Sequence, residues 1–446
     1  MAPHSIIQPF DKKGTWDGGV PTASDPSSGG RLGTLLIVIV CAAPFGPYVI
    51  GNVRLEQLVI YPLAAFLALR GRTWASTNGP WRLTYFLLSL FLFVACLVAL
   101  SDAGLPPGFA PLGVAAGVDN CAIALAVGLV VVEGYRRIGL DRTLRAAGLT
   151  LAIGLGANAI AELLQLLGLA SFQSFWTSNA SDIVTSAVAL SAQTNGRYSG
   201  IFNQPGEAGA AYGLALIVLT FLPVFRRIER ASLLPLIALG GLLPGSKIFV
   251  LAVVLTLLAL LFGSSKTIAV RVTGLAVACV AGSLAWLLAE PILSGFLSRL
   301  SYSDSITGGL SAGRLGDNGT NLKVIDVVMS NSPLAGFGIA GLDGIAYDSQ
   351  LVELLIYGGV IGAAIWILIW LTLAYGALRL RKILRPFPVL LLLFSFGAAL
   401  GFSPFTANRI AVWMWVFWFA VLLSPTPNEV GRENSGFLGH RASGFY

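Results

Sequence analysis

Three stretches of the sequence combine basic, acidic and small residues in patterns that suit the binding of an anionic substrate. They are Asn-Gly-Arg-Tyr-Ser-Gly-Ile-Phe-Asn-Gln-Pro-Gly-Glu-Ala-Gly at 195–209, Leu-Leu-Pro-Gly-Ser-Lys at 242–247, and a longer stretch at 312–362. Their cations are Arg197, Lys247 and Arg314, and their carboxylates include Glu207 and Asp348. Guanidinium and ammonium groups stabilise phosphate oxygens, and a carboxylate can accept a proton from an attacking hydroxyl. If the protein is an enzyme, these residue types are the ones we expect it to use.

Other catalytic groups are scarce in the sequence. The two histidines, His4 and His440, lie near the two ends of the chain. No Asp-x-Asp pair lies at the end of an expected helix, and no phosphate-binding glycine loop follows an expected strand. We therefore predict chemistry without a metal and without a cofactor, with Arg or Lys as the electrophilic clamp and a carboxylate as the base.

Basic residues are divided unevenly between two sets of chain turns once the long apolar segments are marked. Of the 28 Lys and Arg residues, 21 fall at the chain ends and at one set of turns, and seven fall at the other set. These seven are Arg54, Arg197, Lys247, Arg299, Arg314, Lys323 and Arg409. Because basic loops are retained in the cytoplasm during insertion, the richer side and both termini are predicted to be cytoplasmic. The seven cations on the outer side oppose this topology, so each of them needs a local structural or functional reason to be there.

The elements that must position these residues are apolar helices. The chain is 56% hydrophobic and 11% charged, which excludes a soluble globular domain. About twelve segments are long enough to be predicted spans: 32–51, 55–69, 81–100, 111–133, 145–168, 208–225, 231–244, 248–263, 270–291, 349–376, 387–404 and 409–424. We predict an all-α integral membrane protein. The net charge of +7 indicates contact with anionic lipid headgroups and no nucleic-acid partner.

The predicted organisation is one polytopic membrane domain between two tails. The tails are a disordered cytoplasmic segment at 1–31 and a second cytoplasmic segment at 426–446, with the membrane domain at 32–425. Two long extracytoplasmic loops, 169–207 and 292–348, are predicted to carry short interfacial helices. In the second loop Leu322, Ile325 and Val328 recur at helical spacing, with Lys323 and Asp326 on the opposite face.

The order of the three stretches resembles the O-antigen polymerase and ligase superfamily of bacterial envelope enzymes. The resemblance covers about 195–365. It consists of Arg197-x-Ser-Gly-x-Phe followed by Pro205, the Ser246-Lys247 turn, Gly313-Arg314 followed by Pro333-Leu-x-Gly-x-Gly, and Gly358-Gly-x-Ile-Gly. The spacing from Arg197 to Gly213 also matches an arginine, fifteen residues, glycine pattern of polymerases in this superfamily.

The resemblance implies a GT-C-like, metal-independent glycosyltransferase at the outer face of the bacterial cytoplasmic (inner) membrane. Donor and acceptor would be undecaprenyl-diphosphate-linked oligosaccharides. A chain-length regulator and a flippase of the same pathway are the implied protein partners. Arg197, Arg314 and Lys247, with Tyr198, Gln204 and Tyr347, would bind the diphosphate and substrate, and Asp348 or Glu207 would be the base.

Ligases of this superfamily carry a histidine near the start of the helix that follows the second long loop (292–348), which we call the large loop. This chain has Asp348 at that position. The difference favours a polymerase for exopolysaccharide, capsule or O-antigen over the alternative, an O-antigen ligase. A lipid-linked saccharide flippase or secondary transporter is the alternative from another class. Unequal outer loops, missing internal repeats and mostly uncharged spans weigh against it.

Structural roles compete with these functional ones. Asp348 could be a helix N-cap, Glu207 could simply begin a helix after Pro205, and Arg197 and Arg314 could form structural ion pairs. Arg299 and Lys323 would be solvated faces of interfacial helices, and Arg54 and Arg409 would extend to lipid headgroups. Asp119 and Glu162 are acids within apolar segments, explained either by function or by pairing with Asn120 or a nearby cation. Trp413, Trp415 and Trp418 are expected to lie at the interface or in the packing.

Overall fold

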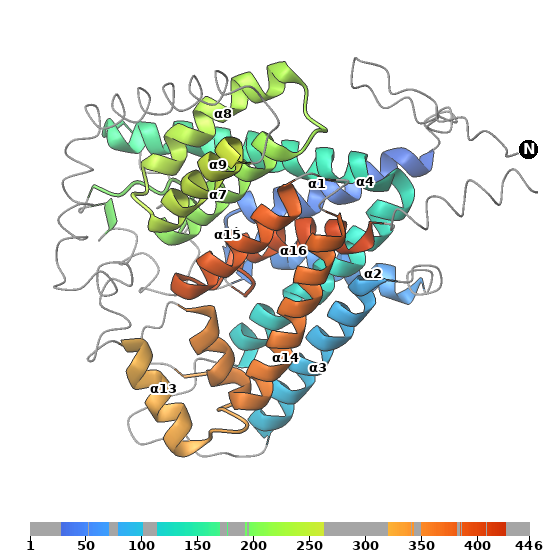
Figure 1. Cartoon of the computed structure of the whole chain (residues 1–446), viewed down its shortest axis with the longest axis vertical. Helices are drawn as coiled ribbons and strands as arrows, with labels where there is room; N and C mark the ends of the chain where they lie inside the picture. Colours follow the sequence, from blue (N-terminus) through green and yellow to red (C-terminus); the bar gives the residue numbers. More distant parts are fainter. Residues whose placement is uncertain are drawn as a thin grey trace, which may run out of the picture.

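The computed structural model describes residues 28–51, 53–70, 79–100, 114–169, 176, 192–193, 196–262, 320–339, 341–342, 349–380, 384, 386–406 and 408–424. Its helices are α1 (Ser28–Ala42), α2 (Leu55–Leu69), α3 (Pro80–Leu100), α4 (Val114–Leu166), α7 (Pro205–Phe221), α8 (Arg227–Leu242), α9 (Lys247–Phe262), α13 (Thr320–Asn331), α14 (Gln350–Leu380), α15 (Phe387–Gly401) and α16 (Asn408–Leu423). A 3₁₀ turn, η1 (Ala43–Phe45), and a two-stranded antiparallel hairpin, β1 (Tyr48–Ile50) and β2 (Val53–Arg54), connect α1 to α2. The described chain is therefore predominantly α-helical, as the sequence predicts (Figure 1).

Three described helical stretches are long and apolar enough to cross a membrane, by length and composition. They are Pro80–Leu100, Gly117–Leu166 and Gln350–Leu380. Shorter apolar helices of 10–17 residues accompany them, at Gly29–Phe45, Leu55–Leu69, Pro205–Phe221, Lys247–Leu261, Phe387–Gly401 and Arg409–Leu423. The structure thus supports an all-α protein of membrane type. The number of twelve spans stays a prediction, and the expected segment at 270–291 lies outside the described residues.

Several helices begin or end where the sequence chemistry changes. The first expected segment, 32–51, is not one helix: α1 ends at Ala42, and Pro44 and Pro47 follow, which cannot donate the next helical hydrogen bonds. The expected segments 111–133 and 145–168 belong to one long element, α4. Gly139 interrupts it with φ 74° and ψ 177°, a conformation open mainly to glycine.

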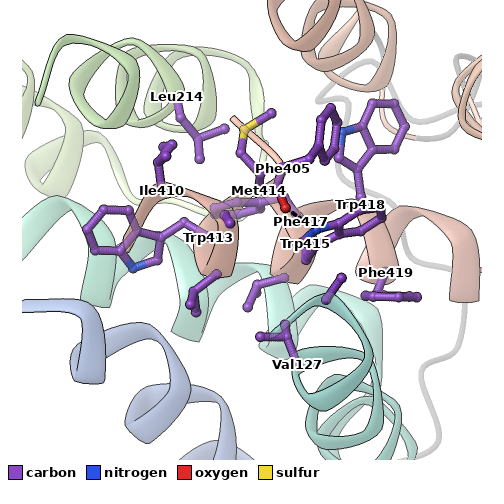
Figure 2. Packing of buried hydrophobic residues seen from close by; sticks show 14 of the residues in the cluster. Val127, Leu214, Phe405, Ile410, Trp413, Met414, Trp415, Phe417, Trp418 and Phe419 are labelled. Carbon is purple, nitrogen blue, oxygen red and sulfur yellow. Dashed lines mark hydrogen bonds between the residues drawn. The ribbon is translucent and has the colours of Figure 1, made fainter. Parts of the chain in front are cut away.

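Helix α16 forms the centre of the bundle. It contacts α1, α3, α4, α7 and α14, and every residue from Ile410 to Phe419 is fully buried. Figure 2 shows Trp413, Trp415 and Trp418 packed between neighbouring helices. Their indole N–H groups donate to Cys41 O, Phe405 O and Ser395 Oγ. The expected packing role of these tryptophans is confirmed, because a helix that is apolar on all sides is stable only when enclosed.

The short helix expected in the second long loop is present as α13, which packs against α14. Val324 and Val328 are fully buried and Lys323 and Asp326 are exposed. Leu322, expected on the inner face, is exposed instead. The buried face is therefore turned slightly from the predicted one.

Candidate functional site

The basic turn is the segment 243–247, between α8 and α9. Gly245 has φ 58°, which lets the chain reverse tightly, and Lys247 begins α9. Arg197 lies on this turn: its Nε donates to Pro244 O at 2.9 Å. The backbone N–H of Tyr198 donates to Leu243 O at 3.1 Å. The structure therefore brings together two predicted cations, Arg197 and Lys247, and the neighbouring Tyr198.

Close packing of α7 on α9 fixes the basic turn from a second side. A Cβ on Gly209 would clash with the side chain of Ser246. One turn further along, a Cβ on Gly213 would lie 2.8 Å from Ala252 Cβ and 2.9 Å from the ring of Phe394. Gly213 thus has a packing reason in this fold: a larger residue there would push α7 away from α9 and α15.

The segment that follows Arg197 is held by polar side chains of α4. The backbone N–H of Ile201 donates to Asn158 Oδ1 at 2.8 Å, and that of Gly200 donates to Gln165 Oε1 at 3.1 Å. Gly200 has φ 61°, and a Cβ at this position would clash with Asn158. Glu162, one turn from Asn158, accepts its amide N–H at 2.9 Å. Asn120, the expected partner, donates to Glu353 instead, and Glu162 Oε2 has no hydrogen-bond partner among the described residues.

Helix α7 begins with the predicted site residues Gln204 and Glu207. Gln204 is the exposed N-cap and Pro205 the first helical residue. Glu207 is buried, and its Oε1 accepts the backbone N–H of Arg409 at 3.3 Å. The helix-starting role of Pro205 is confirmed, and the base role of Glu207 stays a prediction.

Arg409 does not extend to a membrane surface as expected; this expectation is wrong. Its side chain is 0% exposed. The guanidinium donates from Nη1 to Ile201 O and from Nη2 to Gly46 O at 3.3 Å. Arg409 therefore joins two segments by hydrogen bonds: the segment after Arg197, at Ile201, and the turn before β1, at Gly46.

Arg54 is likewise buried, at 5% exposure, so the expectation that it reaches lipid headgroups is also wrong. Its Nη2 lies 2.8 Å from Asp119 Oδ2 and its Nη1 3.0 Å from Glu56 Oε1. Gln57 Nε2 and the Tyr61 hydroxyl also donate to Asp119, at 2.6 and 2.7 Å. The expectation that a neighbouring cation explains Asp119 is confirmed.

Tyr48 connects these two arginines to the segment after Arg197. Its hydroxyl accepts Asn203 Nδ2 at 2.7 Å. Burial raises the pKa of Tyr48, and the positive charges of Arg54 and Arg409 partly oppose that change. The phenol therefore acts as a neutral hydrogen-bonding group. We call residues 46–51, 53–57, 119–120, 199–207, 349–353, 402–406 and 408–409 the polar junction.

Helix α14, which follows the large loop, also begins in the polar junction. Gln350 accepts the backbone N–H of Phe405 at 3.1 Å and donates to Thr406 Oγ1 at 3.2 Å. Glu353 accepts the Thr406 hydroxyl at 2.5 Å and Asn120 Nδ2 at 3.4 Å. Arg314, Tyr347, Asp348 and Arg299 lie outside the described residues, so their predicted roles stay predictions.

Two glycine motifs that carry the family resemblance lie against each other. Phe337 N donates to Ile356 O at 2.7 Å, and Val360 N donates to Pro333 O at 2.9 Å. Gly359 interrupts α14 with φ 57° and ψ −149°. The Pro333–Gly338 segment therefore packs into the break in α14.

The sequence reasoning missed several polar residues of this site. Asn158 and Gln165 share a face of α4 with Glu162, because they are spaced by four and three residues along the helix. That stripe of polar residues in an apolar segment was a usable signal. Tyr48 and Asn203 carry no comparable pattern. Within the described residues, no group of three or more His, Cys, Asp or Glu is placed to hold a metal ion.

Comparison with known proteins adds no assignment: no protein-family model and no curated protein matches the chain.

Proposed function

We propose that this protein is a metal-independent membrane glycosyltransferase that polymerises a lipid-linked saccharide. It transfers a growing glycan from undecaprenyl diphosphate to a lipid-linked repeat unit at the outer face of the cytoplasmic membrane. The placement of Arg197 on the basic turn, beside the start of α9 at Lys247, is the observation that carries the proposal. Two cations and a helix N-terminus attract the oxygens of a diphosphate.

The fixed position of Arg197 suits stabilisation of a leaving group. Charge develops on the diphosphate as the glycosidic bond breaks, and preorganised donors stabilise that charge without rearranging. The Nε of Arg197 is directed to Pro244 O, and the flanking backbone is bonded to α4 and to Leu243. Arg314 would complete the clamp from the large loop, and Asp348 or Glu207 would accept the proton of the acceptor hydroxyl.

Helix lengths support a site below the membrane surface. Helices α2, α7, α15 and α16 have 15, 17, 15 and 16 residues. At a rise of 1.5 Å per residue they are roughly 22–26 Å long, shorter than the hydrocarbon core of about 30 Å. In a bilayer the polar junction at their ends would sit at headgroup depth or deeper. There its backbone groups must be satisfied within the protein.

The test is incubation of purified protein with a lipid-linked repeat unit, followed by separation of the products by length. A product ladder is expected for the wild type. Arg197→Ala should lower the rate by about 10²–10³, by analogy with the loss of an oxyanion-hole donor. Arg197→Lys should recover little of it, because a point charge cannot replace a planar fork. Wild-type ladders in both variants would contradict the proposal.

Arg227→Ala is the matched control for loss of a basic residue. Arg227 is exposed and begins α8, the helix whose far end leads into the basic turn. Arg227 and the basic turn are therefore roughly 24 Å apart, at opposite ends of a helix of 16 residues. The product ladder of Arg227→Ala should equal that of the wild type.

A lipid-linked saccharide flippase is the second candidate, and one observation favours it. The interior of the bundle contains more ionisable side chains than expected. Glu56, Asp119, Glu162 and Glu353 all face it. Ionisable residues inside a membrane bundle often mark a transport route. Proteoliposomes containing a fluorescent lipid-linked saccharide separate the two: lipid movement without a product ladder would support the flippase.

A further inference from the structure

Five charged residues of the polar junction form a compact charge cluster: Arg54, Glu56, Asp119, Glu207 and Arg409. Arg54 is paired with Glu56 and Asp119, and Glu207 is bonded to the backbone of Arg409. Electrostatic interactions also join Glu56 to Arg409 and Glu207 to Arg54. With every group ionised, two guanidiniums face three carboxylates, which leaves one negative charge uncompensated. An uncompensated charge in a buried site is costly.

Asp119 is not the place for a compensating proton. It already receives three side-chain hydrogen bonds, from Arg54, Gln57 and Tyr61, at distances between 2.6 and 2.8 Å. A proton on this carboxylate would remove the negative charge that these donors, one of them a guanidinium, stabilise.

Glu56 has the opposite surroundings. It is 1% exposed, and neither of its carboxylate oxygens receives a hydrogen bond from another residue. Arg54 lies 3.0 Å away, yet its other terminal nitrogen is directed to Asp119. The terminal nitrogens of Arg409 are bonded to Ile201 O and Gly46 O. Glu56 therefore shares one cation with a carboxylate that holds it by a better hydrogen bond.

A second buried acceptor in the junction also lacks a donor. Asn203 Oδ1 receives no hydrogen bond, although its amide nitrogen is bonded to Tyr48. Tyr48 in turn interacts with Arg54, Arg409 and Glu207. The junction thus contains three buried acceptor oxygens without a hydrogen bond, two on Glu56 and one on Asn203, together with two unbonded guanidinium nitrogens, Arg54 Nη1 and Arg409 Nε. Buried polar atoms normally have a partner, and a proton on one of these oxygens would supply a donor to the excess of acceptors.

We propose that the charge cluster binds one proton, held as a carboxylic acid by Glu56. The proton removes the excess negative charge and converts one acceptor oxygen into a donor. The groups facing this carboxyl are Arg54 from β2, Asp119 from α4 and Arg409 from α16, with Tyr48 and Glu207 beside Arg54. The site is a property of the fold and does not depend on the proposed glycan transfer.

Infrared spectroscopy of the full-length protein in lipid nanodiscs tests the proposal. The carbonyl stretch of a protonated carboxylic acid shifts to lower frequency in deuterated water, which separates it from ionised carboxylates. The difference spectrum between wild type and Glu56→Gln at neutral pH should contain this band. Glu133→Gln is the control, because Glu133 is bonded to Arg137. Its difference spectrum should show only loss of an ionised carboxylate.

Three results would overturn the proposal. One is a Glu56→Gln difference spectrum that shows loss of an ionised carboxylate, which would mean that water alone occupies the site. Another is disappearance of the band when sodium chloride replaces choline chloride, which would identify a metal cation as the occupant. If Glu56→Gln does not fold, Glu56→Asp is used: the band should move in frequency. An unmoved band would assign the proton to another residue.

Discussion

Gly336 and Gly359 meet backbone to backbone. A Cβ on Gly336 would lie 2.7 Å from Gly359 N, and a Cβ on Gly359 would lie 2.6 Å from Gly336 N. Each glycine also has positive φ, 67° and 57°. One motif lies within the large loop and the other in α14, and they are mutually dependent, since neither glycine can accept a side chain without displacing the other.

The first prediction concerns this contact. Gly336→Ala should destabilise the protein more than Gly168→Ala does. Both glycines have nearly the same φ, 67° and 68°, but nothing lies within 4 Å of a Cβ on Gly168. Gly168→Ala should cost about 1–2 kcal/mol from backbone strain alone. Melting in detergent should show a further loss for Gly336→Ala, and equal melting temperatures would show that the contact can relax.

The second prediction concerns Arg409. Arg409→Leu should reduce stability by about 3–5 kcal/mol, because it leaves Glu207 inside the junction without the balancing cation. It also removes the donors to Ile201 O and Gly46 O. Arg31→Leu, at an exposed position of α1, should change stability by no more than about 0.5 kcal/mol. Similar melting temperatures for the two variants would contradict the role given to Arg409.

The third prediction concerns the attachment of the segment after Arg197 to α4. Asn158→Leu removes the acceptor of the Ile201 amide, at a cost of about 1–3 kcal/mol. Hydrogen exchange at Ile201 should accelerate, and glycan transfer should fall because Arg197 loses its fixed position. Thr150→Val, on the same helix, removes only a bond to Ala146 O and is the control. Unchanged exchange at Ile201 in Asn158→Leu would rule out the attachment.

The fourth prediction concerns the base and the absence of a metal requirement. Chelator should leave the transfer rate unchanged, and Asp348→Asn should remove activity, because Asn caps a helix about as well as Asp but is not basic. Glu207→Gln should retain activity, since the amide oxygen can still accept the Arg409 N–H. Activity in Asp348→Asn with loss in Glu207→Gln would move the base to α7.

The fifth prediction follows from the proton at Glu56. The folded protein holds this proton at a pH at which an unfolded chain, with a glutamate pKa near about 4.3, has released it. Folding then takes up a proton, so stability falls as pH rises, by up to about 1.4 kcal/mol per pH unit. From about pH 5 to neutral pH, where the unfolded chain has released the proton and the folded protein still holds it, stability should change with pH less favourably for the wild type than for Glu56→Gln, as measured by melting temperature. Parallel curves would show that no proton is taken up there.

The sequence predicts local features of this fold well. Apolar length located α2 and α3 closely, and proline and glycine explain where α1 ends and where α4 is interrupted. The common placement of Arg197 and Lys247 was also predictable in part, because both were expected on the outer side of the bundle, Arg197 in the first long loop and Lys247 in a tight turn.

The partners of Arg54 and Arg409 were not predictable in the same way. Position near a helix end suggested exposure, but the acceptors of Arg409 are 208 and 363 residues away in sequence. The need of the Ile201 and Gly46 carbonyls for a donor becomes visible only when the helices are packed together. The same applies to Tyr48 and Asn203, which are 155 residues apart.

The enclosure of α16 has a consequence for biosynthesis. The last described helix of the chain is also the most enclosed, with α1, α3, α4, α7 and α14 around it (Figure 1). Until the ribosome has released residue 423, the helices made earlier have no central partner, and the carbonyls of Gly46 and Ile201 have no guanidinium. Synthesis of the earlier helices and assembly of the bundle are therefore separate events for this protein. A chain truncated before Asn408 would leave an unfilled space in the bundle that quality-control proteases can recognise.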